Sequence, residues 1–218
     1  ETRIRKTVLN PLLMKKLIRA QELAQWMGYK SYVHLSVEAR RVDLRAQIKL
    51  GAGFLTASDP MFKRLMGQVA RENLGVALAK VRRADHARMF RASKVERQLP
   101  RTLMIPAFKY FLRGMGLDMS TAAKTRIVVD DAMHPKKNPR AACFPLDVPR
   151  DIRVTVKPAG GLSSWVTFFH EGGHALHFAW TTHRRFAFQQ LGSYGLTEAM
   201  AELFARVWEE PTWLARYG

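Results

Sequence analysis

Apolar residues recur at intervals of three and four over most of the first 120 positions, and this spacing constrains the fold more than any other feature. In 10–27, for example, Leu13, Leu17 and Ala24 fall near one stripe of a helix. Proline and glycine punctuate the pattern, with Gly28 as a helix stop. The spacing predicts helices over 10–27, about 33–50, about 60–92 and 103–115, with a break at 51–53.

The pattern changes near residue 125, where short strand-like runs, two of them rich in β-branched residues, replace the helical spacing. Three such runs, which we expect to form a small antiparallel sheet, are 126–131, 142–145 and 152–157. A helix capped by Ser163 or Ser164 then follows to about Trp180, and a final helix runs over about 194–208. The sequence therefore predicts a mainly α fold, with a helical region over 1–120 and a second region with the sheet over 121–218.

The chain is strongly basic, with 36 Lys and Arg against 18 Asp and Glu and a net charge of +18. Solvated helix faces are the favoured interpretation, with an acidic partner surface and nucleic acid as alternatives. We do not expect nucleic acid as a partner, because no aromatic residues interleave with the basic ones in the way that single-strand binding requires. The lone Cys143 excludes an internal disulfide and fits a reducing compartment. Because there is no long apolar run or signal peptide, we expect a cytoplasmic protein with no membrane partner.

The residues suited to chemistry lie on the helix predicted after position 163, in the segment His170-Glu171-Gly172-Gly173-His174. This is the H-E-x-x-H pattern found in zinc peptidases. Residues four apart on a helix project from the same side, so both imidazoles can bind one metal ion. Glu171 is turned about 100° away and can reach a water molecule on that ion.

A catalytic zinc site needs a third protein ligand, for which Glu198 is the leading candidate. It stands 24 residues after His174, which leaves room for a chain reversal and a second helix packed against the first. Glu202 lies one helical turn later on the same face. Its expected role is to accept the spare N–H of His170 or His174 and so fix the orientation of that ring.

The H-E-x-x-H pattern also occurs by chance, and two histidines on an apolar helix can be ordinary core residues. Here the apolar flanks, the preceding strand and the paired carboxylates that follow favour a metal site. We expect His177 to pack or to support the site, since a third ligand from the same helix is poorly placed for a tetrahedron. Gly172 and Gly173 each cost roughly 1 kcal/mol of helix stability relative to Ala. A close packing contact would explain that cost, with a plain helix irregularity as the alternative.

These motifs resemble those of the metallopeptidase family that includes thimet oligopeptidase and oligoendopeptidase F. FHEGGHALH at 169–177 is similar to the family's HExGHxxH, and LTEAMAELF at 196–204 is similar to its glutamate-bearing helix. RAQELAQWMGYKSY at 19–32 resembles the family's helix and Gly-Tyr turn.

The resemblance implies a zincin-like helical fold in which His170, His174 and Glu198 bind Zn²⁺ and Glu171 acts as general base. Family members are longer, and they supply Tyr and His residues that stabilise the transition state from a segment after the third ligand. This sequence ends 20 residues after Glu198. We expect a zinc-dependent endopeptidase or oligopeptidase acting on short peptides, with a catalytically incomplete zinc-binding or protein-binding module as the alternative. The strand at 152–157 is expected to pair with an extended substrate.

Overall fold

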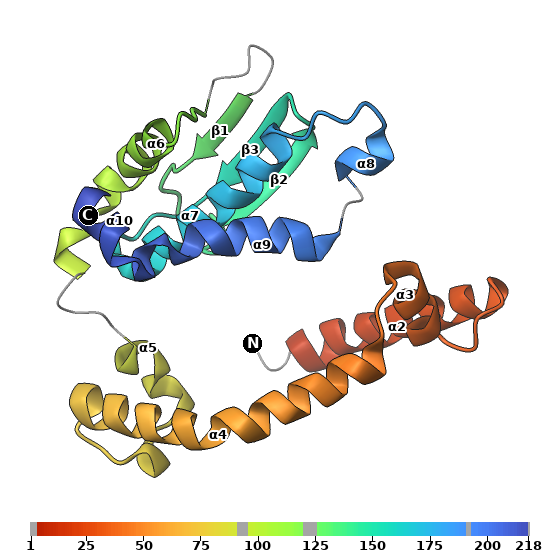
Figure 1. The fold of residues 1–218 in the computed structure, drawn as a ribbon. Coiled ribbons are helices and arrows are strands. Elements are labelled where there is room, and N and C mark those ends of the chain that lie inside the picture. Colours follow the sequence, from red (N-terminus) through yellow and green to blue (C-terminus); the bar gives the residue numbers. More distant parts are fainter. Residues whose placement is uncertain (1–3, 91–95, 120–125, 191–192, 218) are drawn as a thin grey trace. The chain divides into compact units, whose positions relative to one another are not determined.

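The computed structural model describes residues 4–90, 96–119, 126–190 and 193–217. It divides into two compact units, Glu1–Phe90 and Arg91–Gly218. Most of the described chain is helical and a single three-stranded sheet lies in the second unit, which confirms the expected mainly helical fold with a small sheet (Figure 1). None of the described helices combines the length and apolar character needed to cross a membrane.

The first unit consists of helices joined by short turns. They are α2 (Asn10–Trp26), α3 (Tyr32–Arg40), α4 (Leu44–Leu74) and α5 (His86–Met89). A π-helical turn, Arg5–Leu9, precedes α2, and the helix predicted over 10–27 is confirmed.

The helix break predicted at 51–53 is wrong, because α4 runs through Gly51, Gly53 and Pro60 without interruption. The break comes earlier, where Asp43 accepts a hydrogen bond from the backbone N–H of Ala46 at 3.0 Å and caps a new helix. An aspartate in this position satisfies one of the unpaired N–H groups of the first turn. The cap therefore decides where the helix begins, and the glycines lie inside it.

The second unit holds the sheet and the remaining helices. Its elements are α6 (Met104–Gly114), β1 (Arg126–Asp130), β2 (Ala142–Asp147), β3 (Asp151–Thr155), α7 (Gly161–Ala179), α8 (Phe186–Gln190), α9 (Tyr194–Ala205) and α10 (Pro211–Tyr217). The compact units divide at residue 90 and not at the change of composition near 120, since α6 contributes to the core of the second unit.

The sheet is mixed, so the expected antiparallel arrangement is wrong for one of its two pairings. The strand order is β1-β3-β2, with β3 parallel to β1 and antiparallel to β2. The longer connection 131–141 reverses the chain direction and leaves room for one strand between β1 and β2. A short turn after β2 reverses the direction again, and β3 fills that central place. Because the chain has reversed twice, β3 runs parallel to β1.

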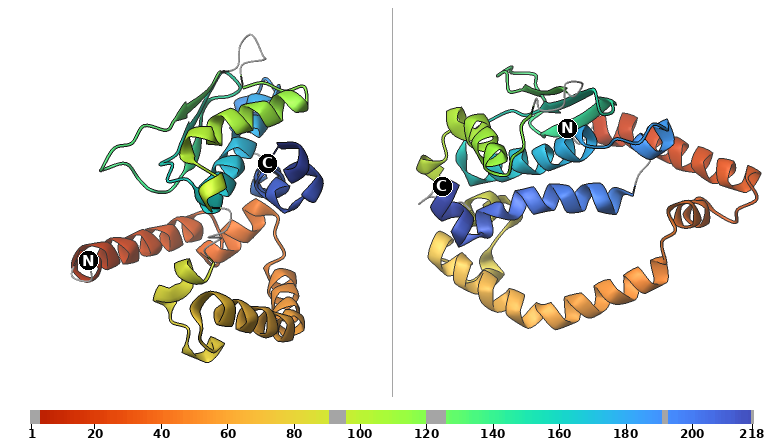
Figure 2. Two further views of the ribbon diagram at one scale, coloured as in Figure 1. Left: turned by 90° about the vertical axis from the view of Figure 1, so that its left-hand side faces the viewer. Right: turned by 45° about the horizontal axis from the view of Figure 1, so that its top comes forward.

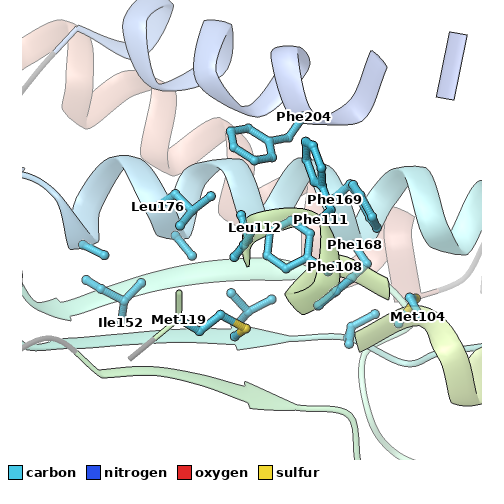
Figure 3. Close-up of a cluster of buried hydrophobic side chains, with 14 of the residues drawn as sticks. Met104, Phe108, Phe111, Leu112, Met119, Ile152, Phe168, Phe169, Leu176 and Phe204 are labelled. Carbon is cyan, nitrogen blue, oxygen red and sulfur yellow. The ribbon is translucent and has the colours of Figure 1, made fainter. Parts of the chain in front are cut away.

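The core of the second unit lies where α6 and α7 meet the sheet, and α7 lies between the sheet and α9 (Figures 1 and 2). Phe108 from α6, Phe168 and Phe169 from α7 and Ile152 from β3 are buried there, with at most 2% of their surface exposed (Figure 3). The rings of Phe108 and Phe169 meet edge to face, with centroids 4.9 Å apart. This aromatic packing fixes α7, the helix that carries the H-E-x-x-H segment.

Candidate metal centre

The local sequence dictates where α7 begins. Gly160 and Gly161 both have positive φ angles, of 79° and 77°, which favour glycine, and the helix starts at Gly161. The predicted serine cap is therefore wrong. Ser164 lies inside the first turn, where its hydroxyl accepts a hydrogen bond from the backbone N–H of Ala159 at 3.3 Å. The helix is long enough to carry the whole H-E-x-x-H segment.

The buried face of α7 sets the direction of the two histidines. Trp165, Phe169 and Leu176 are buried in the core and fix the rotation of the helix about its axis. His170 and His174 then lie at the edge of that face, with 24% and 13% of their side-chain surface exposed. Their ring centroids are 4.8 Å apart and the rings are almost perpendicular.

Gly173 lets α9 approach α7 closely. A Cβ atom at Gly173 would lie 2.7 Å from the carbonyl oxygen of Met200 and 2.8 Å from Cα of Ala201, both in the backbone of α9. At Gly172 a Cβ atom would overlap the ring of Phe108. Both glycines are therefore explained by close packing, and the one at 173 brings the acidic side chains of α9 next to the histidines.

The three predicted ligands come together at this crossing. Oε2 of Glu198 lies 3.6 Å from Nε2 of His170 and 3.7 Å from Nε2 of His174. One ligand atom from each of the three residues lies within 4.8 Å of the other two, so the group could hold a metal ion. The side chain of Glu198 is 55% exposed, which leaves the group open to solvent on the α9 side.

The opposite nitrogen of each imidazole has a partner on α9. Nδ1 of His170 lies 3.6 Å from Oε1 of Glu202, the neighbour that the sequence predicted. Nδ1 of His174 is hydrogen-bonded to Oγ1 of Thr197 at 2.9 Å. Each ring thus has its Nδ1 directed at α9 partners and its Nε2 directed at Glu198, which is how supported metal-binding histidines are arranged.

Two of the three spacings between the donor atoms are close to those of a tetrahedral divalent ion, and the whole group spans up to 4.8 Å. Two atoms that each lie about 2.0–2.1 Å from such an ion are about 3.3–3.4 Å from each other. The separations of 3.6 and 3.7 Å between Glu198 and the two histidines are close to this spacing. Two imidazoles and one carboxylate are also the donor types of a catalytic zinc site. His177 is not part of the group, and burial together with the nearby His174 lowers its pKa.

Glu171 lies on the side of α7 that faces β2. Its charge acts on Cys143, and burial together with this charge raises the pKa of the thiol to about 12. Cys143 therefore remains protonated at neutral pH and packs as a small, partly buried side chain.

Comparison with family models, curated proteins and solved structures returned no match for this chain. The assignment of this site accordingly rests on its own geometry.

Within the part of the chain that the structure describes, Thr197 contributes to the site and was not predicted from the sequence. The sequence did not indicate this role, because no spacing pattern distinguishes a threonine that contacts a metal-binding histidine from any other threonine in an apolar helix. Only the crossing of α7 and α9 shows that its hydroxyl reaches Nδ1 of His174.

Proposed function

We propose that the chain is a zinc-dependent peptidase that hydrolyses peptide bonds in short peptides. The observation that carries the proposal is the convergence of His170, His174 and Glu198, with Glu171 on the helix between the two histidines. Two supported imidazoles and a carboxylate that can hold an ion, with a second carboxylate available as a base, are the chemistry that metal-assisted hydrolysis of an amide requires.

Each residue has a distinct task in this proposal. His170, His174 and Glu198 hold the ion, which when bound polarises a carbonyl oxygen and acidifies a water molecule. Glu171 takes the proton of the attacking water and later delivers it to the leaving amine. Glu202 and Thr197 face the Nδ1 atoms and leave Nε2 of each ring available to the ion.

The substrate strand is reassigned by the sheet order. The expectation that 152–157 pairs with a peptide is wrong, because β3 is paired on both sides, with β1 and with β2. Among the described strands β2 lies at an edge and carries Cys143, the thiol on which the charge of Glu171 acts. Under this proposal an extended peptide binds along β2, where its backbone passes the general base.

The test compares the full wild-type chain with the Glu171→Gln variant. Zinc content is measured by atomic absorption, and cleavage of a mixed quenched-peptide library is measured with and without a chelator. Both proteins should bind about one zinc ion, and only the wild type should cleave. Loss of a general base lowers the rate by about 10²- to 10⁴-fold.

The matched control is Glu210→Gln, which removes a carboxylate from an exposed position after α9 and should leave cleavage unchanged. Equal cleavage by wild type and Glu171→Gln would contradict the role of Glu171. Zinc binding without chelator-sensitive cleavage by the wild type would instead assign a binding module of the same fold.

A further inference from the structure

Thr197 makes the shortest polar contact at the metal centre. Its Oγ1 lies 2.9 Å from Nδ1 of His174, and both side chains are partly buried. On the far side of the same ring, Nε2 of His174 lies 3.7 Å from the Glu198 carboxylate. Thr197 therefore contacts Nδ1, one of the two nitrogens that can carry the proton of a neutral His174 ring.

We propose that Thr197 is a positioning residue that holds His174 in the tautomer able to bind the metal ion. This inference rests on the proposed metal centre. A neutral imidazole has one N–H and one lone pair, and the nitrogen that binds a metal must present the lone pair. With Nε2 directed at the ion, Nδ1 carries the proton and donates it to Oγ1 of Thr197.

The hydroxyl makes this support different from that of His170. Glu202 faces Nδ1 of His170 with an ionised carboxylate, which only accepts hydrogen bonds. The Thr197 hydroxyl carries no charge, and it favours the metal-binding tautomer of His174 by accepting a hydrogen bond from Nδ1–H through its oxygen.

Thr197 also links the support to the third ligand. It directly precedes Glu198 in the first turns of α9, so one short segment supplies both a ligand and the partner of another ligand. A substitution at 197 that preserves the helix should consequently weaken metal binding without removing any ligand.

The experiment measures metal affinity in the full chain, independently of cleavage. Wild type, Thr197→Val and Thr197→Ser are titrated with Zn²⁺ against a competing chelator, and with Co²⁺ while the visible absorption is recorded. Valine has the shape of threonine but no hydroxyl, and loss of such a partner weakens metal binding by about 10- to 100-fold. Serine keeps the hydroxyl and should restore the affinity to within about 3-fold of wild type, by the same reasoning.

Thr181→Val is the control, because Oγ1 of Thr181 also makes one partly buried hydrogen bond, to the carbonyl of His177 at 2.8 Å, and lies outside the ligand group. Its affinity should equal that of wild type. Circular dichroism of the metal-free proteins checks the fold, and Thr197→Ala replaces the valine variant if that variant does not fold.

The outcomes separate the two proposals. Equal zinc affinity of wild type and Thr197→Val, or a serine variant as weak as the valine variant, would overturn the role of Thr197. A wild type that binds no zinc would overturn both proposals. Weaker binding by the valine variant together with the absence of peptidase activity in the wild type would support the role of Thr197 and refute the peptidase.

Discussion

Replacing Gly173 with alanine tests whether the crossing of α7 and α9 builds the metal centre. The added Cβ atom would lie 2.7 Å from the carbonyl oxygen of Met200, whereas ordinary contacts of a Cβ atom begin near 3.4 Å. Because the neighbouring atoms belong to the α9 backbone, no side-chain rotation relieves the overlap. The helices must separate by about 0.7 Å, the difference between these distances.

The separation acts directly on the ligands. Glu198 lies 3.6 Å from His170 across the crossing, already slightly more than the 3.3–3.4 Å of a tetrahedral site. Ligand distances in metal sites vary by only about 0.2 Å, so a shift of about 0.7 Å weakens one of the three bonds. Overpacking costs typically 1–3 kcal/mol. If this strain opposes metal binding, the dissociation constant for zinc rises by about 5- to 150-fold.

Zinc competition and urea unfolding of the metal-free chain are the two assays. Gly195→Ala is the matched control, because its Cβ atom would meet only the Ser193 hydroxyl at 3.5 Å, an ordinary contact on the same helix. Gly172→Ala is the second control, since the atoms nearest to its added Cβ belong to the Phe108 ring in the core and not to the α9 backbone. It should lower stability with a smaller effect on zinc. Wild-type zinc affinity and stability in Gly173→Ala would refute the reasoning.

Two further predictions concern the surroundings of the ligands. Glu202→Gln keeps the shape of the side chain opposite His170 but removes its charge. Zinc affinity should therefore fall by about 10-fold in the competition assay. An unchanged affinity would show that Glu202 serves only its ion pair with Arg206. Burial and the charge of Glu171 raise the pKa of Cys143 from 9.0 to about 12 in the folded chain. This difference stabilises the folded state fully below pH 9, and the stabilisation is lost as the pH rises towards 12. In urea unfolding, the stability difference between wild type and Cys143→Ala should change by up to about 1.4 kcal/mol per pH unit above 9, and a constant difference from pH 8 to 11 would contradict the burial of the thiol.

The elements that carry the site could be predicted from the sequence because their signals are local. Local sequence signals placed α7 after the third strand and α9 from about residue 194, and short strand-like runs located all three strands. The ligand residues followed from the spacing of His170 and His174 and from the acidic residue on the next helix. These features depend on neighbours within one or two helical turns, where sequence spacing and spatial position coincide.

The features that the sequence could not predict depend on contacts between distant segments. Strand order follows from which segments pack together, so β3 took the central place that no local pattern indicates. The start of α4 was not predicted, because Gly51 and Gly53 indicated a helix break and the cap depends on the single residue Asp43. The hydrogen bond between Thr197 and His174 exists only because α9 crosses α7 at Gly173. The type of a residue shows which hydrogen bonds it can form, and only the packing of the elements shows which partner it contacts.

The core behind the candidate metal centre determines how far its three donor residues are ordered before an ion binds. The aromatic residues that fix α7 lie on the same helix as the ligands, and Phe169 directly precedes His170 with no exposed surface. On α9, Phe204 packs into the same cluster two residues after Glu202. The burial of these aromatic residues therefore orders the two histidines before an ion binds. Less of the free energy of ion binding is then lost to ordering the histidine side chains. Only Glu198, half exposed at the crossing, remains to be immobilised on binding.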